Sequence, residues 1–173
     1  MAEVEVIFAE AQPSDASALL ALLNHIGYES DFMTLDEAGI LMTLEQMTDF
    51  IRQRQESINQ VCLLAKVADE VIGVLNVTSD FHERIKHIGD IFIGIRKDYW
   101  NQGIGQILME EAIIWAEKSG VIRRLELTVQ KRNQRAVHVY EKFGFVIEGV
   151  RPRGAKARDG QFLDVYMMGK MIN

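Results

Sequence analysis

The sequence predicts one mixed α/β domain that spans residues 1–173 and is built around a single sheet. Its length of 173 residues suits one domain, and strand-like and helix-like segments alternate without repeats or a linker. A turn with two glycines, Gln102-Gly-Ile-Gly105, joins an apolar strand-like run to a helix-like segment. Such a turn presents unpaired backbone N–H groups at the positive end of a helix, which is typical of a phosphate-binding site.

The first half of the chain is expected to form a strand, two helices and three further strands. Pro13-Ser-Asp15 is typical of a helix start, and it precedes the apolar run 18–23. Residues 27–44 have no clear period, contain four carboxylates and no basic residue, and are expected to form a loop or short helices. From apolar spacing, the strands are predicted at 4–9, 61–67, 71–77 and 85–95, and the second helix at 43–56.

The second half predicts a helix, a strand, a helix and two strands. The helix after the double-glycine turn is expected to end at Gly120, and Asn133 is a good N-cap for the last helix, which Gly144 closes. The strands are predicted at 125–129, 145–150 and 162–168, with a basic loop at 151–158. The residues expected to face inward are Ile104, Ile107, Leu108, Ala112, Trp115 and Ala116 on the first helix, and Ala136, Val139, Tyr140 and Phe143 on the second.

The composition is that of a soluble globular protein, with 48% apolar and 25% charged residues. The start of the chain lacks the features of a signal peptide, and no apolar run approaches the ~20 residues of a membrane span. The only cysteine, Cys62, lies in an apolar strand and is expected to be a buried thiol rather than a nucleophile. We therefore expect a cytoplasmic protein from a reducing compartment that does not bind membranes.

The charge is unevenly distributed along the chain. Residues 1–120 hold 8 Lys and Arg against 20 Asp and Glu, whereas residues 121–173 hold 11 against 5. This is either uneven solvated surface or a sign that the C-terminal part holds an anionic ligand and the N-terminal part attracts a cationic one. The net charge of −6 argues against nucleic acid as a partner, and the four histidines lack metal-ligand spacing.

Two common phosphate-binding motifs do not fit the double-glycine turn. A Walker loop would need Gly-Lys followed by Ser or Thr, which is missing near this turn. A dinucleotide-binding turn would need a third glycine three residues after Gly105, where this sequence has Leu108.

A third pattern does fit. The strand, turn and helix around Gln102-Gly-Ile-Gly105 are followed by the segment Asn133-Gln-Arg-Ala-Val-His-Val-Tyr-Glu-Lys-Phe-Gly-Phe145. The two motifs in this order resemble those of the GNAT family of N-acetyltransferases, and the order of elements matches over nearly the whole chain. The resemblance implies a single GNAT domain, with a central mixed, mostly antiparallel sheet flanked by helices, and acetyl-coenzyme A as co-substrate.

The pyrophosphate would lie on the backbone N–H groups of the turn, those of Asn101, Gln102, Gly103, Ile104, Gly105 and Gln106. The family loop usually has Arg or Gln where this sequence has Trp100, so only the backbone donors carry over.

The resemblance also implies a set of catalytic and cofactor-binding residues. A bulge in the strand before the turn would expose backbone groups of Ile93, Gly94 and Ile95 to the pantetheine arm and the thioester oxygen. Glycine inside a strand independently indicates a bulge or a close backbone approach. Tyr140 matches the general acid of the family, although it also lies on the apolar stripe of its helix. Asn133 matches a residue that binds pantetheine, or it serves as a helix cap only.

Other residue roles are less specific. Asp90 shares a strand face with Gly94 and is a weak candidate for the general base, since an ordinary exposed carboxylate is as good an interpretation. Glu83 and Glu29 are weaker candidates still. A cluster of basic residues could bind the 3′-phosphate of coenzyme A or simply be solvated: Lys131, Arg132 and Arg135.

The resemblance therefore implies an enzyme that transfers an acetyl group to a primary amine by direct attack on the thioester. The acceptor would be a small amine, a polyamine, an amino acid or a peptide N-terminus, and the acidic residues 27–44 favour a cationic one. Two alternatives remain, a non-catalytic module that binds acyl-coenzyme A and an acyltransferase with a longer acyl donor. The resemblance is compatible with a homodimer, for which the sequence itself holds no signal.

Overall fold

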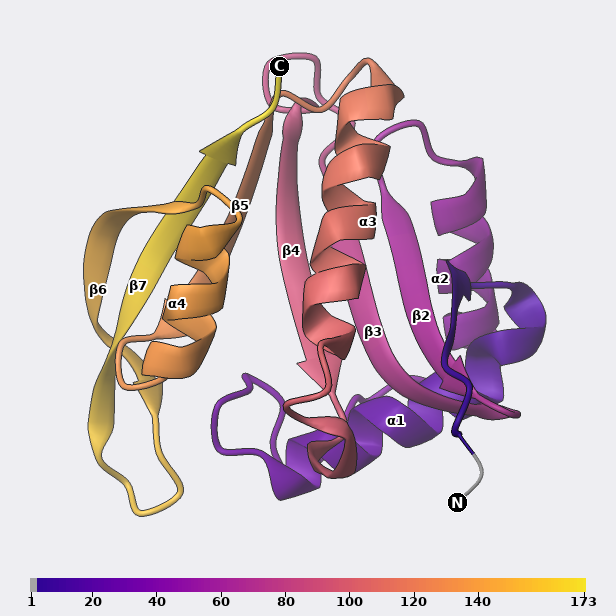
Figure 1. The fold of residues 1–173 in the computed structure, drawn as a ribbon, viewed down its shortest axis with the longest axis horizontal. Coiled ribbons are helices and arrows are strands. Elements are labelled where there is room, and N and C mark those ends of the chain that lie inside the picture. The colour runs from indigo at the N-terminus through magenta and orange to yellow at the C-terminus, as the bar shows by residue number, and fades with distance from the viewer. Residues whose placement is uncertain (1–2) are drawn as a thin grey trace.

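A computed structural model describes residues 3–173 as a seven-stranded sheet with helices on both faces (Figure 1). The strands are β1 (Ile7–Glu10), β2 (Val61–Val67), β3 (Glu70–Thr78), β4 (Ile88–Ile95), β5 (Arg124–Gln130), β6 (Val146–Lys156) and β7 (Phe162–Met171). The helices are α1 (Ala16–Glu29), α2 (Leu44–Glu56), α3 (Ile104–Ser119) and α4 (Gln134–Lys142), with short 3-10 turns at Pro13–Asp15 and Lys97–Tyr99.

The sheet has the strand order β1-β2-β3-β4-β5-β7-β6 and is antiparallel except between β4 and β5. These two strands are parallel and pair only near their starts, from Ile88 opposite Arg124 to Asp90 opposite Glu126. Beyond that point they diverge, as Figure 1 shows. We call the gap between residues 91–95 of β4 and 127–130 of β5 the wedge. Its open end lies at the C-terminal ends of both strands.

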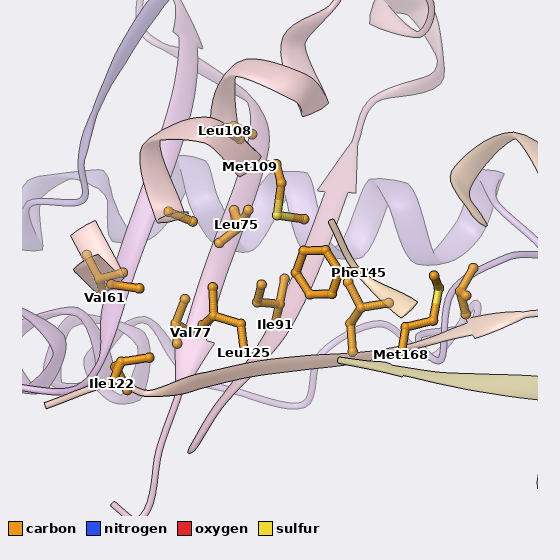
Figure 2. Packing of buried hydrophobic residues seen from close by; sticks show 14 of the residues in the cluster. Val61, Leu75, Val77, Ile91, Leu108, Met109, Ile122, Leu125, Phe145 and Met168 are labelled. Carbon is orange, nitrogen blue, oxygen red and sulfur yellow. The ribbon is translucent and has the colours of Figure 1, made fainter. Parts of the chain in front are cut away.

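Two apolar cores lie on opposite faces of the sheet. The core beneath α3 and α4 contains side chains from β2, β3, β4, β5 and β7 (Figure 2). In that view Leu108 and Met109 of α3 lie over Leu75 and Ile91 of the sheet. The other core is formed by α1 and α2 against the opposite side of β2 and β3. Burial of each large apolar side chain contributes about 1.5–3 kcal/mol. Strand β4 contributes Ile91 to the first core, and its Phe92 packs against the second, so both cores stabilise its position.

The helix and strand pattern follows the sequence prediction, with differences at particular ends. Gly27, which was expected in a loop or a short helix, lies in α1, where an added Cβ would come 2.6 Å from the carbonyl oxygen of Asp36, so glycine lets the following loop approach the helix. The predicted strand 85–95 begins only at Ile88, since the preceding residues form turns in which Ile85 N–H bonds to the His82 oxygen. On α3, Met109 is fully buried and Ile107 is 40% exposed, so the predicted inward position of Ile107 is wrong. The buried stripe of α3 follows Leu108 and residues four apart from it instead.

The basic loop predicted at 151–158 is wrong for most of its length. Residues up to Lys156 belong to β6, which pairs with β7 across a register shift between Arg151 and Ala155. Arg153 within that shift has φ 52°, a left-handed conformation that bends the strand. Only the connection after Lys156 is a turn.

Two expectations from composition can be compared with the structure. Cys62 is a buried free thiol, as predicted, and burial raises its pKa to about 12. A thiol with such a pKa stays protonated at neutral pH and is a poor nucleophile. Within residues 3–173, no helix is both long enough and apolar enough to cross a membrane.

Candidate active site

The wedge exposes backbone groups of β4. The amide of Arg96 donates to the carbonyl of Ile72 at 2.9 Å, which fixes the alternation of the β3–β4 ladder. Backbone groups of Ile91, Ile93 and Ile95 therefore point away from β3, toward β5, which has already diverged. A strand edge of this kind offers donors and acceptors to a ligand that enters between the strands.

The expected bulge does not occur in the pairing of β4 with β3. The register runs without a shift from Gly73 opposite Ile95 to Thr78 opposite Asp90. The strands separate because β5 diverges. Gly94 has a different reason: an added Cβ would lie 2.5 Å from Cδ1 of Ile26 and 3.2 Å from Cε of Met33. Gly94 thus allows α1 and the following loop to approach β4 closely.

Trp100, the departure from the family pattern, anchors the turn to the strand. Its indole N–H donates to the carbonyl of Ile95 at 2.8 Å, and its ring is partly buried. This bond occupies one of the backbone acceptors at the open end of the wedge. The amide of Ile95 and both backbone groups of Ile93 still point toward β5.

The double-glycine turn leads into a helix whose first donors are free. Gly103 is the N-cap of α3 with φ 79°, and no side chain within the described residues caps this helix. The helical bonds begin with Ile107 N–H to the Gly103 oxygen at 3.1 Å. The preceding amides, including those of Ile104, Gly105 and Gln106, therefore have no intrahelical acceptor. Together with the helix dipole, they form a site suited to an anion.

Tyr140 lies on α4, on the same face of the sheet as α3. Its ring packs against the core and meets Phe145 edge-on, with centroids 6.2 Å apart. Burial raises the pKa of Tyr140 to about 12, so the phenol is protonated at neutral pH. Its hydroxyl makes no hydrogen bond to any described residue. Asn133 accepts a hydrogen bond from Ala136 N–H at 3.3 Å and so caps α4, which leaves its side-chain amide donors available.

Asp90 lies at the closed end of the wedge, on the other face of the sheet. It follows Gly89 and precedes Ile91, which face the α3 core, so alternation places its side chain on the side of Phe92 and α1. Its neighbours across the sheet are Thr78 and Glu126. Desolvation and, to a lesser extent, the charge of Glu126 raise the pKa of Asp90. Tyr140 and Asp90 therefore approach the sheet from opposite faces.

The basic residues near α4 have different surroundings. Arg132 is engaged by Asp31, with Nη2 2.8 Å from Oδ2, and is therefore not a free phosphate ligand. Lys131 and Arg135 are exposed, and Lys131 borders a surface cavity of about 410 Å³ between α4 and the start of β7. Among residues 3–173, no group of three or more His, Cys, Asp or Glu side chains is arranged to hold a metal ion.

The acidic segment 27–44 runs from the last turn of α1 through a loop to the start of α2, and all four of its carboxylates have protein partners. Glu29 accepts from the amide of Lys97 at 2.7 Å and Asp36 from the amide of Ala38 at 2.9 Å. Glu37 lies 3.2 Å from Arg158, and Asp31 is bound to Arg132. Apart from the local bond of Asp36, these partnerships connect positions far apart in the sequence, so sequence patterns gave no signal for them. The weaker base candidates also find other roles, because Glu83 pairs with Lys86 on the surface.

Comparison with known proteins identifies the family. A model described as the acetyltransferase (GNAT) family matches residues 31–145. A GNAT-family acetyltransferase structure from Streptococcus pneumoniae is 51% identical, with a TM-score of 0.94 over 98% of this chain and 100% of that chain. An L-amino acid N-acetyltransferase of Escherichia coli strain K12 is 33% identical over 109 residues, which are 63% of this chain and 67% of that protein.

A more distant structure has a bound ligand. It is a GNAT-superfamily phosphinothricin acetyltransferase from Sinorhizobium meliloti, solved with acetyl-coenzyme A, and it shares the fold at 15% identity. Its TM-score is 0.81 over 97% of this chain and 89% of that chain. The predicted fold class and family are confirmed, and the chain belongs to the GNAT family of acetyltransferases.

Proposed function

We propose that this protein transfers an acetyl group from acetyl-coenzyme A to a primary amine. The observation that carries the proposal is the wedge between β4 and β5, which opens beside the uncapped N-terminus of α3. A pantetheine arm carries amide groups that suit the free backbone of Ile93 and Ile95. The adjacent pyrophosphate suits the free amides of Ile104, Gly105 and Gln106. One ligand therefore satisfies both groups of unpaired donors.

The residues around the wedge have distinct roles in this proposal. A backbone N–H of β4 that faces the wedge donates to the thioester oxygen as negative charge develops there, an effect of about 10²–10³ in rate. Asp90 accepts a proton from the acceptor ammonium, either directly or through water, and thereby frees the lone pair that attacks the carbonyl carbon. Tyr140 donates its proton to the departing thiolate, a contribution of about 10²–10⁴, and the remaining extra proton on the attacking nitrogen returns to the phenolate through water. The opposite approach of Asp90 and Tyr140 suits an attack in which the amine and the thiolate lie on different sides of the reacting carbon.

We propose an α-amino group as the acceptor to test first. The acidic loop was expected to favour a cationic acceptor, but its carboxylates already have partners such as Arg132, Arg158 and Lys97. The loop thus offers less attraction to a polyamine than its composition suggests. The Escherichia coli relative is named for L-amino acids, which supports this choice.

The direct test measures release of the coenzyme A thiol from acetyl-coenzyme A with a panel of amines. The panel contains L-amino acids, phosphinothricin, peptides with free N-termini, polyamines and simple primary amines. We expect release that depends on the amine, and mass spectrometry of the product should locate the acetyl group on nitrogen. Chemically acetylated amines, which have no nucleophilic nitrogen, are the matched controls and should release no thiol.

The same assay distinguishes the two alternatives. A non-catalytic module would bind acetyl-coenzyme A with measurable affinity yet release no thiol with any amine of the panel. An enzyme for longer acyl donors would release thiol faster from butyryl- or hexanoyl-coenzyme A than from acetyl-coenzyme A. Either result would overturn the proposed reaction while leaving coenzyme A as the ligand.

A further inference from the structure

The C-terminal end of α1 crosses the open end of the wedge. Glu29 accepts a hydrogen bond at 2.7 Å from the amide of Lys97, the second residue beyond β4. Two residues further on, Asp31 bonds to Arg132, the second residue beyond β5. Since β4 and β5 are parallel, their C-terminal ends lie at the same edge of the sheet. Residues 28–31, here called the α1 bridge, are therefore attached to both sides of the wedge.

The attachment on the β5 side involves several bonds. The backbone oxygen of Asp31 accepts from the side-chain amide of Gln130, at 3.1 Å, and from Arg132, at 2.9 Å. Its carboxylate accepts from Arg132 and from the backbone N–H of Arg158, at 3.1 Å. The Arg158 guanidinium also donates to the carbonyl of Tyr28, where a cation suits the negative end of α1. The Arg132 hydrogen bond lowers the pKa of Asp31, which stays ionised at neutral pH.

The attachment on the β4 side is equally specific. The second carboxylate oxygen of Glu29 lies 2.9 Å from Nε2 of His25 on the preceding turn of α1, which orients the side chain. The same helix packs against β4 at Gly94, where Ile26 leaves no room for a side chain. Lys97 begins the turn that leads to the free amides of α3. The bridge thus touches the start of the candidate pyrophosphate site.

We propose that the α1 bridge sets the separation of β4 and β5, and that Glu29 and Asp31 are positioning residues for coenzyme A. The inference rests on the proposed function to the extent that the pantetheine arm enters the wedge. The two strands pair only from Ile88 to Asp90, so their far ends need another connection to keep one spacing. Without the bridge, the wedge samples other widths, and only a fraction of molecules is ready to bind. Apparent affinity falls by that fraction.

If the α1 bridge connects the two strands, release of either end should break the connection. The effects of substitutions at Glu29 and at Asp31 should therefore be coupled. The test is a double-mutant cycle on Glu29→Ala and Asp31→Ala, which remove the accepting side-chain oxygens, with coenzyme A itself as the probe in isothermal titration calorimetry. Each single variant should weaken coenzyme A binding by about threefold to tenfold, and the double variant should bind about as weakly as either single one. Asp36→Ala removes a carboxylate from the same loop whose bond, to the amide of Ala38, is local and reaches neither β4 nor β5. As the matched control, it should bind coenzyme A like the wild type.

Three outcomes are decisive. Effects that multiply in the double variant would show two independent contacts and would overturn the bridge. Single variants that bind like the wild type would overturn it too. A wild-type protein that binds no coenzyme A would instead contradict the proposed function, so the two failures are distinguishable.

A measurement on the wild type covers the case in which a variant fails to fold. Hydrogen exchange can follow the amides of Lys97 and Arg158, which donate to the two ends of the bridge. If the bridge opens as a unit, both amides exchange with the same free energy of opening. Clearly different free energies for the two amides would overturn the proposal.

Discussion

The Tyr140 side chain combines a ring packed against the core with a hydroxyl that bonds to none of residues 3–173. Burial alone raises its pKa to about 12, so the proton stays on the phenol over the range in which amines become nucleophilic. Phenylalanine at this position would keep the packing of the ring, because the contacts of the ring with the core are apolar. Replacement of Tyr140 by phenylalanine should therefore remove the acidic hydroxyl while the stability of the fold is kept.

Tyr140→Phe should lower turnover at least tenfold while coenzyme A still binds with wild-type affinity. The rate of the wild type should rise with pH as the acceptor amine loses its proton, and no fall due to Tyr140 is expected below about pH 11. Steady-state kinetics from pH 6 to 10 and calorimetry with coenzyme A check both points. Unchanged turnover in the variant would remove Tyr140 as the general acid.

At Asp90, the charged form of the side chain lowers the stability of the folded protein. The side chain is exposed on the sheet surface, yet partial desolvation and, to a lesser extent, the charge of Glu126 raise its pKa above the ordinary value of 3.8. A raised pKa means that the folded protein prefers the protonated form. The stability that Asp90 contributes is therefore present below pH 3.8 and is lost as pH rises through the raised pKa.

Asp90→Asn should raise the melting temperature at pH 7, and this gain should shrink as the pH approaches 3. If Asp90 is the base, turnover at neutral pH should fall about tenfold or more at saturating acetyl-coenzyme A. Thermal melts across this pH range and amine-dependent thiol release measure the two effects. A variant that is stabilised but fully active would show that Asp90 has no catalytic role.

At the scale of elements, the turn into α3 contains two glycines with different reasons for being there. Gly103 has φ 79°, where an L side chain is strained by about 1–2 kcal/mol. Gly105 lies in the first turn of the helix, and an added Cβ would meet Cδ1 of Ile93 at 3.8 Å, an ordinary contact. The fold thus requires glycine at 103 and leaves 105 unexplained by protein contacts.

Gly105→Ala and Gly103→Ala form a matched pair that tests the anion site. Gly105→Ala should melt at or above the wild-type temperature, because alanine favours helix by about 0.5–1 kcal/mol. It should nevertheless bind coenzyme A about tenfold more weakly, if the pyrophosphate approaches the backbone there. Gly103→Ala should melt at a lower temperature. Wild-type coenzyme A affinity in Gly105→Ala would argue against a pyrophosphate at this turn.

The sequence predicted most elements correctly because their signals are local. The N-cap Asn133 and the C-terminal Gly120 mark helix ends through short-range bonding and a left-handed conformation. The end strand β6 was missed beyond Val150 because it is exposed on both faces, so it has no apolar alternation to detect. Pro152 also indicates a loop in the sequence. In the structure, Pro152 and the bent backbone at Arg153 belong to an edge strand.

At the scale of the whole molecule, most features of the site that sequence reasoning missed depend on long-range contacts. The amide of Lys97 and its acceptor Glu29 are 68 residues apart, and Asp31 and Arg132 are 101 apart. Motifs identified the turn and α4, because those contain their functional groups within a few residues. The reason for Gly94, the role of Trp100 and the α1 bridge required the packed fold.

The single parallel pair also divides the molecule into two parts. Strands β1 to β4 form one block with α1, α2 and α3, while β5, β7 and β6 form the other block with α4 (Figure 1). The blocks share a continuous ladder only at the start of β4 and β5. Under the proposed function, the pantetheine amides would bond to backbone groups that no protein strand reaches. The co-substrate would then complete the sheet as a removable strand. Each catalytic cycle would insert and withdraw that strand. The sheet would then be continuous beyond Asp90 only while the co-substrate is bound.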